Sequence, residues 1–501
     1  MIIAIIHQYT VKIASWYRYA KENGELSFWI VFAVTVYLPF EEFVIKFTPF
    51  RGIILFGFRV LTTEFIIFAL FLKLIYEIIF RGKQFKRTPL DILFIALLCS
   101  IFISIIINKA QIIESLVNIR PIFRYIPLYY VVVHLDISRE KLSLTLKTIR
   151  RIGLFQSLLA TFQYFAPVSI SNFFLPLDTG VSVGGYQRSM LPAKTGAALG
   201  TMGISPNLTT FSLISLSLFI TTIYSKAKKA YLPSLQEIFW ILIIFFSIFA
   251  TLKRASLVLA VLIPILVLWH LNKRKKALKL GWFYGAIFFG LIFTLLVANF
   301  QPQSLAGRDD RQERIEPSAY IIEIFTPEYW EKTSENSRGW MIRYVGSSLL
   351  RSEGIWFGFS PAWTTLKDRL IELNKDDPFA QQRFEESIIT TFEDTYWLAM
   401  LAYYGIIGVL IYLLILWRLY RSCRWLTRNS SDPEYQSLGA TVATLIVIYL
   451  FYCWVERVWE LKTISFYFWL LAGLVTNSYY AFKENAIRRQ QMKRIPHENL
   501  K

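Results

Sequence analysis

Long apolar stretches constrain this chain more than any other feature. Each runs for about 17 to 22 residues, enough to cross the roughly 30 Å hydrocarbon core of a bilayer as an α-helix. A mean hydropathy of +0.43 is also too high for a soluble enzyme. The pattern predicts an all-α integral membrane protein with about twelve transmembrane helices, give or take one or two. They begin near Ser27, Val60, Leu90, Leu116, Ile149, Gly203, Glu237, Ser256, Leu280, Asp394, Leu438 and Ile464.

The positive charge is concentrated in alternate loops between these stretches. The formal net charge is +19, and positively charged loops stay on the cytoplasmic side of a membrane. Twelve spans with both termini in the cytoplasm put all the basic segments on that side, so we predict a multi-pass protein of the inner (cytoplasmic) membrane. The cations are then topology determinants, and nucleic acid is not expected as a partner. The segments are Arg81–Arg87, Arg139–Arg151, Lys226–Lys229, Lys273–Lys276, Arg418–Arg428 and the tail from Arg488 to Arg494.

The same topology divides the chain into parts and leaves one large segment outside the membrane. This external, periplasmic domain falls between helices 9 and 10 and lacks the positive bias of the inner loops. The predicted parts are an interfacial N-terminal segment (1–26), helices 1–9 (27–299) with an irregular external loop (167–205), the external domain (300–392), helices 10–12 (393–482) and a basic cytoplasmic tail (483–501). Within the external domain, apolar residues recur at helical spacing from Arg338 to Leu350, and more weakly from Leu366 to Asn374. This spacing predicts amphipathic helices there.

Cations on the predicted outer side have no topological explanation. Arginine guanidinium groups in a partly dehydrated cavity suit a diphosphate, which they bind bidentately while matching its charge. Arg120 and Arg124 are four residues apart, hence on one helix face. The alternative for each is a side chain that reaches the lipid headgroups. The outer cations are Arg120, Arg124, Arg188, Lys194, Lys253 and Arg254.

Two carboxylates stand at the predicted outer end of the tenth span. Glu393 and Asp394 precede a long apolar stretch, so one of them could simply cap the helix. A functional alternative is that one accepts a hydroxyl proton as a general base. The topology puts all four histidines at or near the cytoplasmic side, which leaves no histidine for this work on the outer face. They are His7, His134, His270 and His497.

Three motifs resemble those of the bacterial O-antigen ligase and polymerase superfamily, polytopic glycosyltransferases with a large external loop before the last three spans. The resemblance is strongest from about Gly185 to Gly408. The motifs are Arg188 with Gly203-Ile-Ser-Pro-Asn207, then Thr251-Leu-Lys-Arg-Ala-Ser256, then Ser337-Arg-Gly-Trp340 through Gly354-Ile-Trp-Phe-Gly-Phe-Ser-Pro361. Ligases of the superfamily typically carry a His-Asn pair before the helix that contains Gly405-Ile-Ile-Gly408. Glu393-Asp394 at that place is more similar to the polymerase branch.

The resemblance implies transfer of an oligosaccharide from a polyprenyl diphosphate at the outer membrane face, building O-antigen, capsule or exopolysaccharide. Arg188 and Arg254 would meet the diphosphate, with Lys253, Arg120 and Arg124 nearby, and Glu393 or Asp394 would deprotonate the acceptor hydroxyl. Arg254 would also stabilise the leaving group. Such a reaction requires no metal and no cofactor. The implied partners are the lipid-linked donor, a glycan acceptor, membrane lipids and a chain-length regulator.

The external domain would hold the saccharide through Arg338, Trp340, Arg343 and Trp356, since aromatic faces suit sugar C–H surfaces. Tryptophan at a membrane interface is equally common as a plain anchor. Two alternatives to a polymerase remain. One is a ligase that moves the finished glycan to a lipid or protein acceptor. The other is a polysaccharide exporter, although the chain shows neither the internal symmetry nor the repeated halves typical of exporters.

Overall fold

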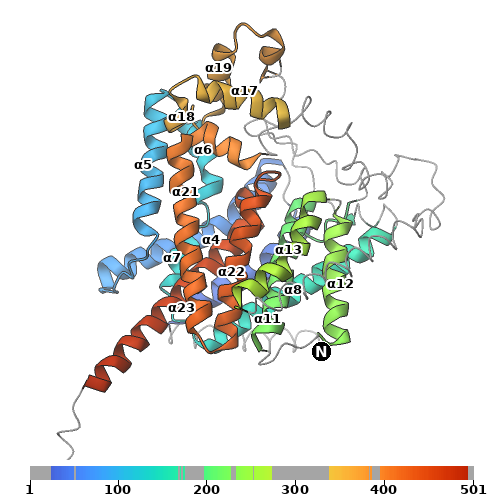
Figure 1. Cartoon of the computed structure of the whole chain (residues 1–501), viewed down its shortest axis with the longest axis vertical. Helices are drawn as coiled ribbons and strands as arrows, with labels where there is room; N and C mark the ends of the chain where they lie inside the picture. Colours follow the sequence, from blue (N-terminus) through green and yellow to red (C-terminus); the bar gives the residue numbers. More distant parts are fainter. Residues whose placement is uncertain are drawn as a thin grey trace, which may run out of the picture.

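The computed structural model describes residues 24–49, 52–166, 170, 173–174, 197–226, 233–251, 253–272, 338–382, 384–385 and 395–494. These residues form helices and no strands (Figure 1), which confirms the all-α class. Four helical segments are long and apolar enough to cross a membrane. They are Leu26–Ile45, made of α2 (Leu26–Tyr37), η1 (Leu38–Phe40) and α3 (Glu41–Ile45), then α11 (Ser205–Lys226), α21 (Tyr396–Asn429) and α22 (Pro433–Tyr452).

Most of the other predicted starts also fall at or near helix starts. Val60 and Ile149 instead lie well inside helices that begin at Gly52 and Arg139, and Leu280 lies outside the described residues. Three of these helices are apolar but short: α5 (Asp91–Ile107), α12 (Leu235–Ala250) and α13 (Arg254–His270). Others are longer but contain charged residues: α4 (Gly52–Arg81), α8 (Arg139–Phe165) and α23 (Lys462–Arg494). The number of membrane crossings therefore stays a prediction.

The predicted fourth span is broken into two helices. α6 (Ile112–Phe123) ends just before Arg124, and α7 (Ile126–Val133) begins after Tyr125. Pro127 stands in the first turn of α7, where a proline costs no helix hydrogen bond, whereas the same ring would clash with the carbonyl four residues earlier in a continuous helix. The break places Arg124 between two helices inside the bundle.

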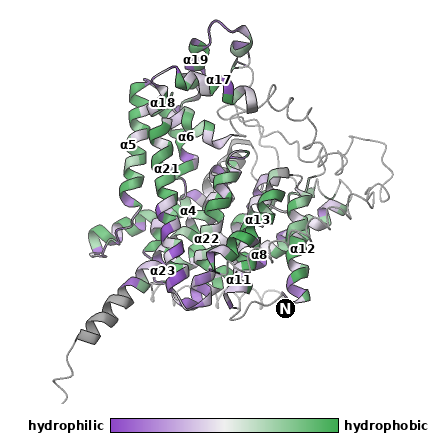
Figure 2. Cartoon of the chain, viewed as in Figure 1, coloured by the Kyte–Doolittle hydropathy of each residue, from purple (hydrophilic) through white to green (hydrophobic). Residues whose placement is uncertain are grey.

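α11 is the central helix and is buried along most of its length. It packs against α8, α12, α13, α22 and α23 (Figure 1). Figure 2 shows that the helices around α11 consist mainly of apolar residues. Small hydroxyl residues of α11 bond across to these neighbours: Thr209 Oγ1 to Thr251 Oγ1 at 2.6 Å, and Thr221 Oγ1 to Thr441 Oγ1 at 2.8 Å. Small side chains with satisfied hydroxyls let helices approach closely where no water can compete.

An irregular stretch, residues 197–204, runs into α11 and is largely buried. Two glutamines of α8 take up its backbone groups. Gln163 Oε1 accepts from the N–H groups of Leu199 and Gly200 at 3.0 and 2.8 Å, and Gln156 Oε1 accepts from the Thr201 N–H at 3.0 Å. Non-helical backbone at membrane depth needs such partners. The end of the predicted external loop is therefore fixed inside the bundle.

The two amphipathic helices predicted in the external segment are confirmed as α17 (Arg338–Leu350) and α19 (Trp363–Leu373). In α17 the predicted apolar face is buried, with Met341 and Val345 fully inaccessible. α17 to α19 lie at the opposite end of the bundle from the C-terminal end of α23 (Figure 1). This arrangement fits the prediction that they stand on the other side of the membrane from the tail.

Two glycines dock the predicted external segment onto α21. Gly358, after α18 (Gly354–Phe357), and Gly405, inside α21, have φ of 74° and 65° with ψ of −176° and −174°, a region that only glycine adopts readily. A Cβ on Gly405 would lie 2.2 Å from the Trp356 carbonyl oxygen, and one on Gly358 would lie 2.4 Å from the Tyr403 carbonyl carbon. The Phe359 N–H donates to the Ala402 carbonyl at 2.7 Å. Two of the motifs quoted above therefore meet backbone to backbone.

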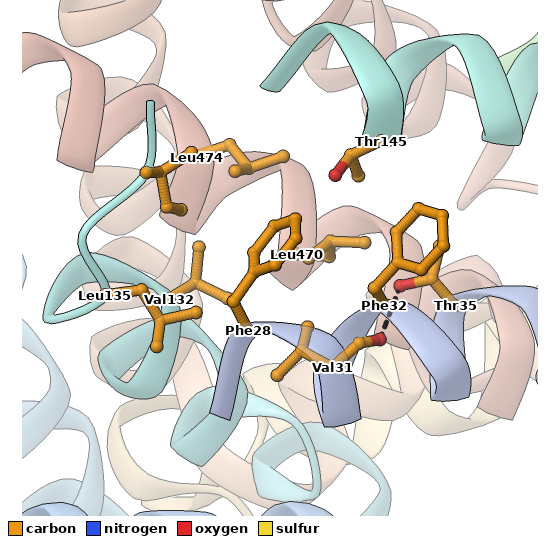
Figure 3. Close-up of a pocket in the computed structure, with 10 residues that line it drawn as sticks. Phe28, Val31, Phe32, Thr35, Val132, Leu135, Thr145, Leu470 and Leu474 are labelled. Atoms are coloured by element: carbon orange, nitrogen blue, oxygen red, sulfur yellow. Dashed lines mark hydrogen bonds between the residues drawn. The ribbon is translucent and has the colours of Figure 1, made fainter. Parts of the chain in front are cut away.

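A small apolar pocket lies between α2, α7, α8 and α23 (Figure 3). Its volume is about 10 Å³, which is at most the space of one water molecule. Leu470 and Leu474 of α23 and Phe28 and Val31 of α2 are among the side chains that line it. It is a packing gap, too small for a substrate.

Replacing Gly405 should weaken this docking. We expect Gly405→Ala to cost about 3 kcal/mol or more, because both the backbone angles and the contact with Trp356 exclude a Cβ. Gly346→Ala is the matched control: Gly346 lies in helix α17 with open space where a Cβ would stand, so alanine should be neutral or slightly stabilising. Thermal unfolding in detergent measures both. Equal midpoints for the two variants would contradict the docking.

Candidate functional site

Charged side chains gather where the helix ends nearest α17 to α19 come together. We call this set the buried charge cluster. Its members come from α3, α4, the end of α6 and the break after it, the connection between α22 and α23, which includes η4 (Val458–Glu460), and the first residue of α23. Buried charges are costly unless paired, and inside a membrane protein they commonly mark functional sites. The members are Glu41, Glu42, Glu64, Arg120, Arg124, Arg457, Glu460 and Lys462.

Glu64 of α4 anchors the two predicted arginines of this cluster. Arg120 binds it bidentately, with Nε and a terminal nitrogen each 2.7 Å from a carboxylate oxygen. Arg124 Nη1 lies 3.7 Å from Glu64 Oε1. The Arg124 side chain is only 11% exposed, and its Nε finds no hydrogen-bond partner among the described residues. Arg124 therefore holds unused hydrogen-bonding capacity beside a shared carboxylate.

A second pair joins the beginning of α23 to α3. Lys462 Nζ lies 2.6 Å from Glu41 Oε2, and the Glu41 side chain is 3% exposed. The charges of Glu42 and Glu64 also act on Lys462. Glu42 in turn packs against Gly203, where an added Cβ would lie 3.0 Å from its Cγ. The Gly203-to-Asn207 motif therefore begins directly beside the cluster.

The third pair lies within the α22–α23 connection. Arg457 bonds to Glu460 three residues later, and both side chains are 10% exposed. Glu460 also feels the positive charge of Arg124. Burial nevertheless dominates and raises the pKa of Glu460, while Arg457 and Arg124 oppose that rise. A carboxylate with a raised pKa beside arginines has the properties of a proton acceptor or donor in a functional site.

The same connection reaches the predicted Lys253–Arg254 position. Lys253 Nζ binds Glu456 Oε2 at 3.0 Å. Arg254 is the first residue of α13, so the free N–H groups of that helix begin beside this pair, and a helix N-terminus favours anions. The Arg254 side chain lies outside the described part of the chain.

The predicted carboxylates Glu393 and Asp394 lie outside the described residues, as does Arg188. The residue after Asp394 is described, however. Thr395 is buried, and the N–H of Tyr396 donates to the Cys453 carbonyl at 3.1 Å. The α22–α23 connection thus binds the beginning of α21, which follows Glu393 and Asp394 in the sequence.

The four residues predicted to hold a saccharide do not share one environment. Trp340 is 3% exposed, and its ring centroid lies 5.3 Å from that of Phe384, so it packs inside the external segment. Trp356 is 59% exposed. Arg343 is exposed and stacks over the Tyr344 ring at 5.9 Å. Arg338 begins α17 and its side chain is not described. Among the three of these side chains that the structure describes, those of Trp356 and Arg343 face outward.

The sequence reasoning missed all four acids of the cluster and two of its four cations. Arg457 and Lys462 stand in a charged stretch between the last two predicted spans, on the predicted outer side. The reasoning that selected Arg254 applies equally to them. Glu64 had a weaker signal, a single acid in an otherwise apolar stretch, and its bond to Arg120 spans 56 residues.

Removing the Glu64 carboxylate should lower the stability of the protein. We expect Glu64→Ala to cost about 3 kcal/mol, because it leaves the buried Arg124 and the partly buried Arg120 without their shared carboxylate. Glu372→Ala is the matched control: its pair with Arg369 lies on the surface of α19, with side chains 48% and 65% exposed, so its loss should cost less than about 1 kcal/mol. The thermal unfolding midpoints of both variants in detergent measure this difference in stability. A Glu64→Ala protein as stable as Glu372→Ala would show that the cluster does not hold these helices.

No family model and no curated protein sequence matches the chain. The likeness to the O-antigen ligase and polymerase superfamily therefore rests on the residues quoted above.

Proposed function

We propose that the chain is a membrane glycosyltransferase that polymerises oligosaccharide units carried on a polyprenyl diphosphate at the outer face of the cytoplasmic membrane. The observation that carries the proposal is the buried charge cluster beside the first residue of α13. Arg120, Arg124 and Lys253, chosen from the sequence, all contribute to this one region. Arg120 and Arg124 both bind Glu64, and Lys253 binds Glu456 in the α22–α23 connection.

The charge balance of this region supports the proposal that further arginines bind the diphosphate. Counting the Lys253–Glu456 pair with the cluster, cations and carboxylates are equal in number among the described side chains. A diphosphate adds negative charge that these pairs do not offset. Arg254 and Arg188 supply the extra cations in the proposal, and the N-terminal N–H groups of α13 add to them.

The proposed reaction is a single displacement at the anomeric carbon of the donor. The acceptor hydroxyl oxygen forms a bond to that carbon, and the hydroxyl proton passes to a carboxylate. The bond between the anomeric carbon and the diphosphate oxygen breaks, and the diphosphate leaves with the electron pair. Cations at the leaving oxygen stabilise the transition state more than the bound substrate, because negative charge grows there as the bond breaks.

Three carboxylates are candidates for the base. Glu393 and Asp394 come from the sequence, and Glu460 is added for its raised pKa. A base acts only when deprotonated, so a raised pKa moves the acidic limb of the pH profile upward from 4.5. Glu393→Gln, Asp394→Asn and Glu460→Gln separate the candidates. We expect the true base variant to lose about 10²-fold or more in turnover while still binding the donor.

Turnover in vitro tests the proposal as a whole. Purified protein in nanodiscs receives a polyprenyl-diphosphate-linked oligosaccharide, and products are separated by length. We expect a ladder of longer lipid-linked products that falls about 10²- to 10³-fold in Arg254→Ala, as for loss of one group that stabilises developing charge. Arg369→Ala on the surface of α19 removes the same charge elsewhere and should leave the ladder unchanged.

The outcome also distinguishes the alternatives. A single transfer that occurs only with a separate lipid or protein acceptor identifies a ligase. Donor bound by the wild type, with no product under any acceptor, contradicts the enzyme proposal and favours an exporter.

A further inference from the structure

A groove lies at the other end of the bundle from the charge cluster, between the end of α13 and the last turns of α21. Its volume is about 520 Å³, within the range of ligand sites. It is lined by Trp269, Trp417, Tyr420, Arg421, Arg424, Trp425, Arg428 and Asn429. No acidic residue belongs to this lining, so the described side chains give the groove a net positive charge.

The three arginines share one face of α21. Arg421, Arg424 and Arg428 follow each other at spacings of three and four residues, which stack them along the helix. Arg424 is 8% exposed, and its Nη1 donates to the His270 carbonyl at 2.7 Å. That bond fixes the inner wall of the groove to α13. Arg421 and Arg428 are exposed at its rim, and neither forms an ion pair with another described residue.

The His270 side chain stabilises the wall of the groove that Arg424 forms. One ring nitrogen lies 3.0 Å from Thr444 Oγ1 of α22 and the other lies 3.2 Å from Tyr420 Oη of α21. The end of α13 is thus tied to two neighbouring helices at the groove. Arg424 therefore stands in a preformed setting and needs no rearrangement to meet an anion.

The position of the groove along the membrane normal indicates that it lies at the level of the lipid headgroups. α21 bends at Gly405, and the part after this bend, from Ile406 to Asn429, is about 36 Å long as a helix, enough to cross the hydrocarbon core of a bilayer. Its last turns, which carry Arg421, Arg424 and Arg428, then lie toward headgroup level. Trp269 and Trp417 are 47% and 55% exposed beside them, as in the aromatic belts at membrane interfaces.

We infer that this groove binds the phosphate headgroup of an anionic phospholipid. The arginines provide bidentate donors for the phosphodiester, and the tryptophans cover the glycerol and upper acyl region. A basic pocket between membrane helices is a physical basis for such recognition. A soluble phosphate would use the same arginines but has no need of the exposed tryptophans. This inference is independent of the proposed glycosyl transfer.

The test is lipid retention by the purified full-length chain, measured by native mass spectrometry after delipidation and addition of one lipid at a time. Phosphatidylglycerol and phosphatidylcholine with identical acyl chains differ only in headgroup. We expect the wild type to retain phosphatidylglycerol preferentially. Equal retention of the two lipids by the wild type overturns the inference without any variant.

A double variant locates the site. Arg421→Ala with Arg428→Ala removes two exposed arginines, and we expect phosphatidylglycerol binding to fall roughly thirty-fold, from about one kcal/mol for each arginine. The control, Lys147→Ala with Arg151→Ala, removes two exposed cations of α8. α8 reaches the same end of the bundle, where Arg139 pairs with Asp432. Equal losses in the two double variants would overturn the assignment to the groove.

Soluble glycerol phosphate distinguishes the two sources of the phosphate. We expect it not to displace phosphatidylglycerol at concentrations similar to that of the lipid, and Trp417→Ala to weaken lipid binding. Effective displacement, with Trp417→Ala binding the lipid as the wild type does, would show that a soluble anion is the ligand and would overturn the phospholipid assignment.

Discussion

The pairing of buried charges around Glu64 is the interaction on which the rest of this structure depends. One carboxylate meets two arginines, Arg120 and Arg124, that belong to the end of one helix and the break after it. Charges at such a depth cannot be left unpaired without a cost of several kcal/mol. The segments that supply the partners must therefore meet at the level of Glu64, which lies inside α4, and this sets the geometry of this end of the bundle.

Several irregular features of the structure lie beside these charges. The fourth predicted span breaks at Arg124 and does not continue as one helix. The connection between α22 and α23 folds inward, so that Arg457, Glu460 and Lys462 meet partners within the bundle. Residues 197–204 enter beside Glu42 with their backbone groups held by two glutamines. Each feature departs from the simple alternation of straight helices and surface loops, and each lies beside the buried charge cluster.

The sequence predicted the parts of the fold that depend on local patterns. Helix starts followed from apolar stretches, and α17 followed from the spacing of Met341, Val345 and Leu349. It did not predict the break at Arg124 or the partners of the arginines, because the bond from Arg120 to Glu64 joins residues far apart in the chain. The sequence selected Trp340 for its aromatic ring, but burial against Phe384 depends on packing between distant segments. Local pattern thus identified two of the four cations, Arg120 and Arg124, whereas Arg457, Lys462 and the acids emerged only from tertiary pairing.

The location of the donor diphosphate is the central claim, and photocrosslinking measures it directly. A polyprenyl diphosphate with a photoreactive group on its first isoprene unit is bound to the purified protein, irradiated, and mapped by mass spectrometry. The account predicts labelled peptides at the beginning of α13 and in the connection between α22 and α23. Labelling confined to the opposite end of the bundle, along the last turns of α21, would contradict it.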